Sequence, residues 1–382
     1  MGRATNINGV TVTGSRNRSN WNINKILGAS KSSDNFISQT LQPGLVKTDS
    51  RSIDLDGEND VIRIDLQSDI FPRNKGTWMQ WWQMRESTND SGRLCFICNQ
   101  NQVAVNAQFH NFFAVATQNV SNSPSAMSMY AEYRCTFGGS IRVQECEMKQ
   151  GSSFHGKGRS RDRNNFSAGG SGAVNEHSTF QLADIRNDGN FHQVVVTWDD
   201  EEQVDSTYST SYTADGISYT FPFGYTGSIR IYLDGTLRNF GQSSGELGPS
   251  DGLTHNRQGK PLNFIPMDPT DSNYAAMDAI YISGRPNNDG LGFDNIEANH
   301  VDALHTEHCL WNKVLSADEV STIYNSGVAS LDLNYNTGNY QSADSVVHLM
   351  DFEDGTATDL SANNNSGSLL NGALIDNEGT GV

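Results

Sequence analysis

Short segments in which apolar and polar residues alternate recur along most of this chain. Residues 52–66 show the pattern twice, before and after Gly57. A period of two places the apolar side chains on one face of a β-strand, whereas an amphipathic helix needs a period near 3.6. This segment is therefore predicted to form two strands separated by a tight turn.

Similar patterns, or short apolar runs bounded by turn residues, predict strands at 77–84, 93–99, 112–117, 127–137, 140–147, 191–199, 228–233, 279–284 and 301–311. Gly138-Gly139 is expected to join two of these strands as a hairpin. Asp234-Gly235 is expected to form a tight turn after another strand. Residues 200–226 are interpreted as a long polar hairpin insertion.

One helix is predicted, close to the C-terminal end. Ser316 is in the N-cap position, and Glu319 three residues later completes a capping box. Gly327 is expected to end the helix. The apolar stripe consists of Val320, Ile323 and Tyr324. Many short strands with one terminal helix predict an all-β jelly-roll sandwich of two antiparallel sheets.

The charge distribution suggests three segments. Residues 1–48 are expected to form an extended basic arm, residues 49–330 the sandwich, and residues 331–382 an acidic C-terminal strand and tail. The first 33 residues contain no acid but five basic residues: Arg3, Arg16, Arg18, Lys25 and Lys31. From residue 331 onward there are eight acids and no Lys or Arg. Such ends can attract each other in neighbouring copies, or can both simply be solvated.

The overall composition argues against several classes of protein. A net charge of -18 opposes non-specific binding to nucleic acid, so the basic residues at 157–163 are expected to be solvated or to contact an acidic partner. No stretch has the roughly 20 apolar residues of a membrane span, and no apolar stretch typical of a signal peptide follows the start.

An odd number of cysteines, 5, disfavours a disulfide framework. A bridge between Cys135 and Cys146 across the expected hairpin stays conceivable.

Three pairs of residues have the types found in chemical sites, and each is expected to be structural. Glu145 and Glu147 are carboxylates two apart on one predicted strand, as a glycoside hydrolase requires, but Glu147 borders a loop. Cys95 and Cys98 lie three residues apart on a strand, which directs the two thiols to opposite faces. The same spacing is expected to separate His305 from His308.

Four segments together resemble the laminin G-like and pentraxin-like branch of the concanavalin A-like lectin and glucanase superfamily. They are Ser52-Ile-Asp-Leu-Asp-Gly-Glu-Asn-Asp-Val-Ile, Phe191-His-Gln-Val-Val-Val-Thr-Trp-Asp, Gly227-Ser-Ile-Arg-Ile-Tyr-Leu-Asp-Gly, and the strand and helix at 302–327. They follow the order of the family. The resemblance implies two packed antiparallel sheets and carries no catalytic residue with it.

The resemblance also implies a place for calcium. Pentraxin-like relatives bind calcium through carboxylate and amide oxygens on loops, and Asn288 and Asp289 fall where those relatives place their acidic loop. An ordinary turn is the alternative, because asparagine here stands where the relatives tend to have acids. No other cofactor is expected.

The function that follows is non-catalytic binding or assembly. Residues 346–367 are similar to a segment found in tailed-bacteriophage structural proteins that carry laminin G-like modules. We therefore expect a virion surface protein, such as a capsid decoration or tail-fibre component, made in the host cytoplasm. Residues 1–48 would contact other virion proteins or copies of the chain, and the sandwich could attach to a host glycan. The alternatives are a free, extracellular or cell-surface lectin and, more remotely, a glycoside hydrolase.

Overall fold

The structure is a computed structural model. It describes residues 5–7, 10–12, 47, 49–67, 69–85, 92–99, 111–119, 127–137, 140–149, 159–162, 188–203, 210–214, 217–221, 226–240, 266–271, 274–286, 296–297 and 300–380. The chain divides into two compact units, residues 1–45 and residues 46–382. In the first unit, β1 (Thr5–Ile7) pairs with β2 (Val10–Val12) in antiparallel fashion.

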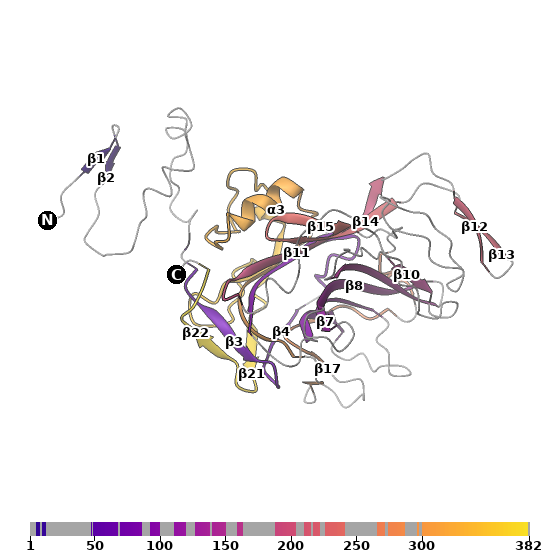
Figure 1. Cartoon of the computed structure of the whole chain (residues 1–382), viewed down its shortest axis with the longest axis horizontal. Coiled ribbons are helices and arrows are strands. Elements are labelled where there is room, and N and C mark those ends of the chain that lie inside the picture. Colours follow the sequence, from indigo (N-terminus) through magenta and orange to yellow (C-terminus); the bar gives the residue numbers. More distant parts are fainter. Residues whose placement is uncertain are drawn as a thin grey trace. The chain divides into compact units, whose positions relative to one another are not determined.

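Most described strands of the second unit belong to two antiparallel sheets (Figure 1). Sheet 1 has the order β10-β9-β8-β7-β6-β16-β4-β21. Its strands are β4 (Val61–Asp65), β6 (Gly92–Cys98), β7 (Phe112–Asn119), β8 (Met127–Phe137), β9 (Ser140–Lys149), β10 (Arg159–Asp162), β16 (Ala279–Ile282) and β21 (Gly367–Leu370).

Sheet 2 has the order β15-β14-β11-β5-β19-β3-β22, with β20 paired to β19. Its strands are β3 (Ser52–Asp56), β5 (Lys75–Met84), β11 (His192–Gln203), β14 (Thr226–Leu233), β15 (Thr236–Phe240), β19 (Asp302–Trp311), β20 (Val346–Met350) and β22 (Leu374–Asp376). Two short hairpins complete the described strands: β12 (Thr210–Ala214) with β13 (Ile217–Phe221), and β17 (Arg285–Pro286) with β18 (Ile296–Glu297).

The predicted all-β sandwich of two antiparallel sheets is confirmed. The alternation at residues 52–66 forms β3 and β4, but these strands do not pair with each other. β3 lies between β19 and β22 in sheet 2, and β4 lies between β16 and β21 in sheet 1. The turn at Gly57 (φ 72°) therefore carries the chain from one sheet to the other.

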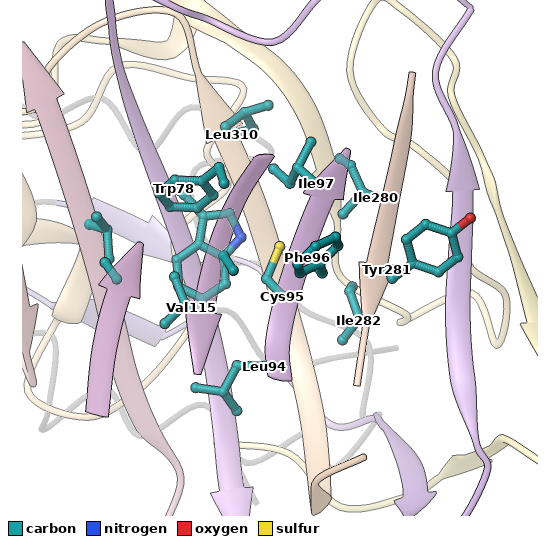
Figure 2. Packing of buried hydrophobic residues seen from close by; sticks show 14 of the residues in the cluster. Trp78, Leu94, Cys95, Phe96, Ile97, Val115, Ile280, Tyr281, Ile282 and Leu310 are labelled. Atoms are coloured by element: carbon teal, nitrogen blue, oxygen red, sulfur yellow. The ribbon is translucent and has the colours of Figure 1, made fainter. Parts of the chain in front are cut away.

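The main hydrophobic core lies between the two sheets. Figure 2 shows Trp78 and Leu310 of sheet 2 beside Val115, Cys95 and Ile97 of sheet 1. All five of these side chains are fully buried. Burial of apolar area on this scale is the main stabilising contribution to a sandwich.

Sheet 2 is covered on its other face as well, by a smaller cluster that includes helix α3 (Ala317–Tyr324). Along β5, Trp78 and Trp82 belong to the core between the sheets, whereas Met79 and Trp81 belong to this second cluster. The two-residue period of the strand thus supplies both faces, which explains why β5 lacks the simple polar alternation of a half-exposed strand.

The N-terminus of α3 is built as predicted. The Ser316 side chain accepts a hydrogen bond from the Glu319 backbone N–H, and the Glu319 carboxylate accepts one from the Ser316 backbone N–H. At the other end the helix stops earlier than Gly327, because Asn325 (φ 46°) already adopts the left-handed conformation of a C-cap. Asparagine tolerates that conformation better than most non-glycine residues.

β19 contains a bulge that the sequence did not reveal. His305 pairs with Trp82 and His308 pairs with Gln80, so Thr306 and Glu307 together oppose the single residue Trp81. Because β19 has one extra residue between them, His305 and His308 lie opposite Trp82 and Gln80, which are two apart on β5. His305 and His308 therefore point to the same face of the sheet. The prediction that their spacing separates them was wrong, although both are core histidines with fully buried side chains.

The two cysteine pairs also have assigned positions. Cys95 pairs with Ile282 and Cys98 with Ala279, an odd separation that directs the two thiols to opposite faces of sheet 1, as predicted. In the β8–β9 hairpin, Cys135 lies opposite Arg142, whereas Cys146 lies opposite Ala131. The conceivable Cys135–Cys146 bridge is therefore not supported by the register.

Residues 331–380, expected to form a strand and tail, contribute to both sheets. β20 pairs with β19, β22 pairs with β3, and β21 pairs with β4. A 3-10 turn at Ala343–Ser345 leads into β20. Among the described residues, no helix is long and apolar enough to cross a membrane.

Candidate functional site

A pocket of about 570 Å³ opens where three separate parts of the second unit meet. One wall is residues 189–192, which lead into β11, and a second is the end of α3. The third wall is residues 378–380, which follow β22. Because the walls extend from β11, α3 and the end of β22, the pocket is held by sheet 2 and the helix that covers it.

His192, the first residue of β11, is the charged centre of the first wall. Its Nδ1 lies 2.9 Å from Asp234 Oδ2, and its Nε2 lies 3.2 Å from Asp188 Oδ2. Both ring nitrogens therefore face a carboxylate. Two carboxylates on one imidazole favour the doubly protonated ring, because only that form donates a hydrogen bond to each.

The pKa values of this group agree with that geometry. Burial of the His192 ring opposes its charged form, but Asp234 and Asp188 outweigh burial and raise the pKa of His192. For Asp188, burial acts upward, and the hydrogen bonds from Asn190 and His192 outweigh it, so the pKa of Asp188 is lowered. Both directions favour a charged His192 beside a charged Asp188.

Local turns place the two carboxylates. Asp188 Oδ1 accepts a hydrogen bond of 2.9 Å from the Asn190 backbone N–H, which closes a turn before β11. Asp234 and Gly235 both have positive φ values, 52° and 69°, and form the predicted tight turn between β14 and β15. Asp234 Oδ1 also accepts a hydrogen bond from the Gln193 backbone N–H at 3.0 Å. The sequence Asp-Gly thus sets both the turn and the position of the imidazole.

Helix α3 supplies an aromatic side chain to the second wall. The Tyr324 ring stacks on Trp81 of β5, with ring centroids 5.7 Å apart and an interplanar angle of 12°. Gly235 makes this close approach possible, because a Cβ at that position would lie 2.8 Å from the Tyr324 Cβ. Phe191, packed against the same cluster, supplies a second partly buried ring.

The third wall is held by Asp49. The Asp49 carboxylate accepts hydrogen bonds from the Thr380 backbone N–H at 2.6 Å and from the Thr306 hydroxyl at 2.6 Å. The Thr380 hydroxyl in turn accepts a hydrogen bond of 2.8 Å from the Ala329 backbone N–H. The end of the described chain is therefore fixed beside the pocket, with the exposed Glu378 at its rim.

The carboxylates beside His192 do not match the acid of a glycoside hydrolase. Glycoside hydrolysis needs a carboxylic acid that keeps its proton near neutral pH, opposite a second carboxylate. Asp188 has a lowered pKa and is held by His192, so it does not supply that proton. The pocket instead offers ring faces, amide and hydroxyl groups on a packed framework.

The candidate residues from the sequence do not lie in this pocket. Asn288 and Asp289 lie outside the described residues, between β17 and β18, so the calcium prediction stays a prediction. Among the residues that are described, no three His, Cys, Asp or Glu side chains are grouped as metal ligands. Glu145 and Glu147 occupy positions on β9 opposite Glu132 and Tyr130 of β8.

Five tryptophans lie in strands of the two sheets, and none of them is available as a sugar platform. All five side chains have no solvent exposure: Trp78, Trp81, Trp82, Trp198 and Trp311. The pocket residues were missed because His192 and Asp234 are 42 positions apart in sequence. The available signal was a histidine at the start of one strand and an Asp-Gly turn at the end of its neighbour.

No protein-family model matches the chain, and no curated protein matches it. Among solved structures it is similar to a native heptameric SAP-like pentraxin from Limulus polyphemus (10% identity, 87% of this chain and 97% of that chain, TM-score 0.41). It is also similar to domains LG4-5 of the mouse laminin α1 chain (13% identity, 72% and 45%, TM-score 0.29). A third similar structure is the enzymatically active domain of tailspike protein 2 from bacteriophage CBA120 (7% identity, 84% and 35%, TM-score 0.36). Similarities at this level assign neither a ligand nor an activity.

Proposed function

We propose that this chain is a non-catalytic glycan-binding protein and that the pocket beside His192 is its binding site. The observation that carries the proposal is the combination of two partly buried rings, Phe191 and Tyr324, with the amide of Asn190 and the hydroxyl of Ser326 around one cavity. Sugars present apolar C–H faces and hydroxyl groups, which suit ring faces and fixed polar groups respectively.

The walls of the pocket are held in place by contacts with neighbouring elements, so binding needs little rearrangement. Each wall is tied to another element: Asp234 to β11, Tyr324 to Trp81 and Thr380 to Asp49. A site whose walls are fixed before the ligand arrives loses less conformational entropy on binding. Weak glycan affinity per contact makes such preorganisation useful.

A glycan array probed with the full chain tests the proposal, with each reproducible hit measured again by calorimetry. Asn190→Trp, which fills the pocket from an exposed position, should abolish binding, and Phe191→Ala should weaken it. Tyr335→Ala is the matched control, because Tyr335 is an aromatic residue 53% exposed and outside the pocket. Hits that survive Asn190→Trp in a correctly folded variant would place the site elsewhere, and an array without hits would refute glycan binding.

A second proposal concerns assembly on a virion surface. Residues 1–45 form a unit of their own, and the chain that follows is anchored on the sandwich at Lys47, which pairs with the buried carboxylate of Glu307. A separate basic N-terminal unit joined to an anchored acidic body supports contact with other virion proteins or with copies of this chain. A cytoplasmic origin and a surface location on the particle belong to this proposal.

Light scattering after gel filtration, at low and high salt, tests the assembly proposal with the full chain. A symmetric oligomer that weakens with salt, or recovery of the chain with purified particles, is expected. A monomer at every salt concentration that never associates with particles would contradict it.

A further inference from the structure

The charges around the His192 pocket restrict the kind of sugar that it accepts. Each ring N–H of the imidazolium faces its own carboxylate, Asp234 at 2.9 Å and Asp188 at 3.2 Å. His192 is the one cation among the described residues that line the pocket, and it therefore has no N–H left for a ligand. Two carboxylates against one imidazolium leave a surplus of negative charge at this wall.

The second wall of the pocket also contributes negative charge. It is the C-terminal end of α3, where backbone carbonyls carry the negative side of the helix dipole. The last turn of α3 has no basic residue to offset it. Tyr324, Ser326 and Gly327, which line the pocket here, bring no positive charge.

The third wall of the pocket is negatively charged as well. Glu378 is exposed at the rim, and it belongs to the segment after residue 331 that contains no Lys or Arg. Behind Thr380 lies the carboxylate of Asp49. The nearby cation Lys47 is paired with Glu307 and with Asp351, the latter at 3.5 Å, and does not line the pocket.

We infer that the pocket selects neutral or amino-bearing sugars and rejects sugars that carry a carboxylate or sulfate. Recognition of such anions uses arginine, lysine or unpaired N–H donors. None of the described lining residues provides an arginine or lysine, and both N–H groups of His192 face protein carboxylates. A free amine would instead meet Glu378 and the end of α3. This inference rests on the glycan-binding function proposed above.

The first experiment sorts the array hits that Asn190→Trp removes. Neutral and amino sugars should dominate them, and raising the salt concentration should weaken amino-sugar hits more than neutral ones. Hits confined to sialylated, uronic or sulfated glycans would overturn the charge inference while the glycan-binding function stands. An array with no pocket-dependent hit removes both.

Matched charge variants provide the second experiment, read by calorimetry on a glucosamine oligomer and its N-acetylated counterpart or on the array hits of those two classes. Glu378→Gln should weaken the amine-bearing ligand about two- to fivefold more than the neutral one, the range for a solvent-exposed ion pair. Glu58→Gln removes an exposed acid outside the pocket and should change neither.

A charge-adding pair completes the test. Ser326→Lys places a cation at the exposed rim and should strengthen a uronic-acid oligomer relative to Ser326→Gln, which adds similar bulk without charge. Equal affinity of the two variants for the acidic oligomer, or an unchanged amine preference in Glu378→Gln, would contradict the inference.

Discussion

At the scale of single residues, two kinds of histidine in sheet 2 respond to acid in opposite ways. His305 is fully buried in the core between the sheets, hydrogen-bonded to Gln80, and burial together with the Arg85 guanidinium lowers the pKa of His305 to about 3. His192 lies at the pocket between two carboxylates, which raise its pKa.

His305 should make the protein less stable in mild acid. The unfolded chain has an ordinary histidine pKa near 6.5 and so binds a proton that the folded chain excludes down to about pH 3. The free energy of unfolding therefore falls as the pH is lowered from about 6.5, by up to about 1.4 kcal/mol per pH unit for this group. In His305→Asn, urea unfolding between pH 6 and pH 4 should show a slope smaller by about that amount. An unchanged slope would contradict a neutral, buried imidazole.

His192→Gln serves as the comparison of opposite sign. Because the folded pKa of His192 is raised, its contribution is fully present below about pH 6.5 and is lost as the pH rises through the folded value. Its removal should therefore alter the slope on the alkaline side of pH 6.5, where His305→Asn has no effect. Neither substitution changes the neighbouring buried histidines His308 and His348, whose rings contact each other, or Asp359, which lies beside His348.

At the scale of elements, the bulge in β19 serves both faces of sheet 2. It turns His305 and His308 inward, where the Trp78 indole N–H donates to His308 Nε2 at 2.8 Å. It also turns Thr306 and Glu307 outward, where they hold Asp49 and Lys47. The one inserted residue thus places two buried histidines between the sheets. It also places the two side chains that bind Asp49 and Lys47 on the opposite face.

Loss of Lys47 should reveal the cost of a buried carboxylate. Glu307 is 2% exposed, and burial, only partly offset by Lys47, raises the pKa of Glu307 to about 7. Lys47→Met should lower the free energy of unfolding at pH 8 by about 3 kcal/mol, the magnitude for breaking a buried pair. Adding Glu307→Gln to Lys47→Met should restore most of the lost free energy of unfolding. The loss caused by Lys47→Met alone should be smaller at pH 5, where Glu307 takes up a proton.

Lys75→Met provides the control for that measurement. Lys75 pairs with Glu201 at 2.8 Å on the surface, where both side chains are largely exposed. Solvent-exposed pairs add little stability, so the urea midpoint should stay where it is. Equal losses from Lys47→Met and Lys75→Met would show that burial of Glu307 has no energetic weight.

At the scale of the whole molecule, local signals in the sequence predicted much of the fold. The capping box of Ser316 and Glu319, the Asp234-Gly235 turn and the alternation in β3 and β4 depend on neighbouring residues only. The β19 bulge, the assignment of β3 and β4 to different sheets, and the pocket at His192 depend on contacts between distant segments. A single sequence records no pairing partner, so these features could not be predicted from it.

The C-terminal segment shows what that non-local pairing means for stability. Residues 346–380 place β20 and β22 in sheet 2 and β21 in sheet 1, and bury Leu349, Met350 and Phe352 in the two clusters. A chain that ends at residue 345 would expose those faces of both sheets at once. It should show no cooperative thermal transition and should bind a dye that reports exposed apolar surface.

A chain that begins at residue 46 is the matched truncation, because it retains the whole of the second compact unit. Both deletions remove a charged end of similar length, but only the C-terminal one removes strands from the two sheets. The chain that begins at residue 46 should therefore unfold cooperatively, with a midpoint within a few degrees of that of the full chain. A cooperative transition in the chain that ends at residue 345 would mean that β20, β21 and β22 are accessories to a sandwich that closes without them.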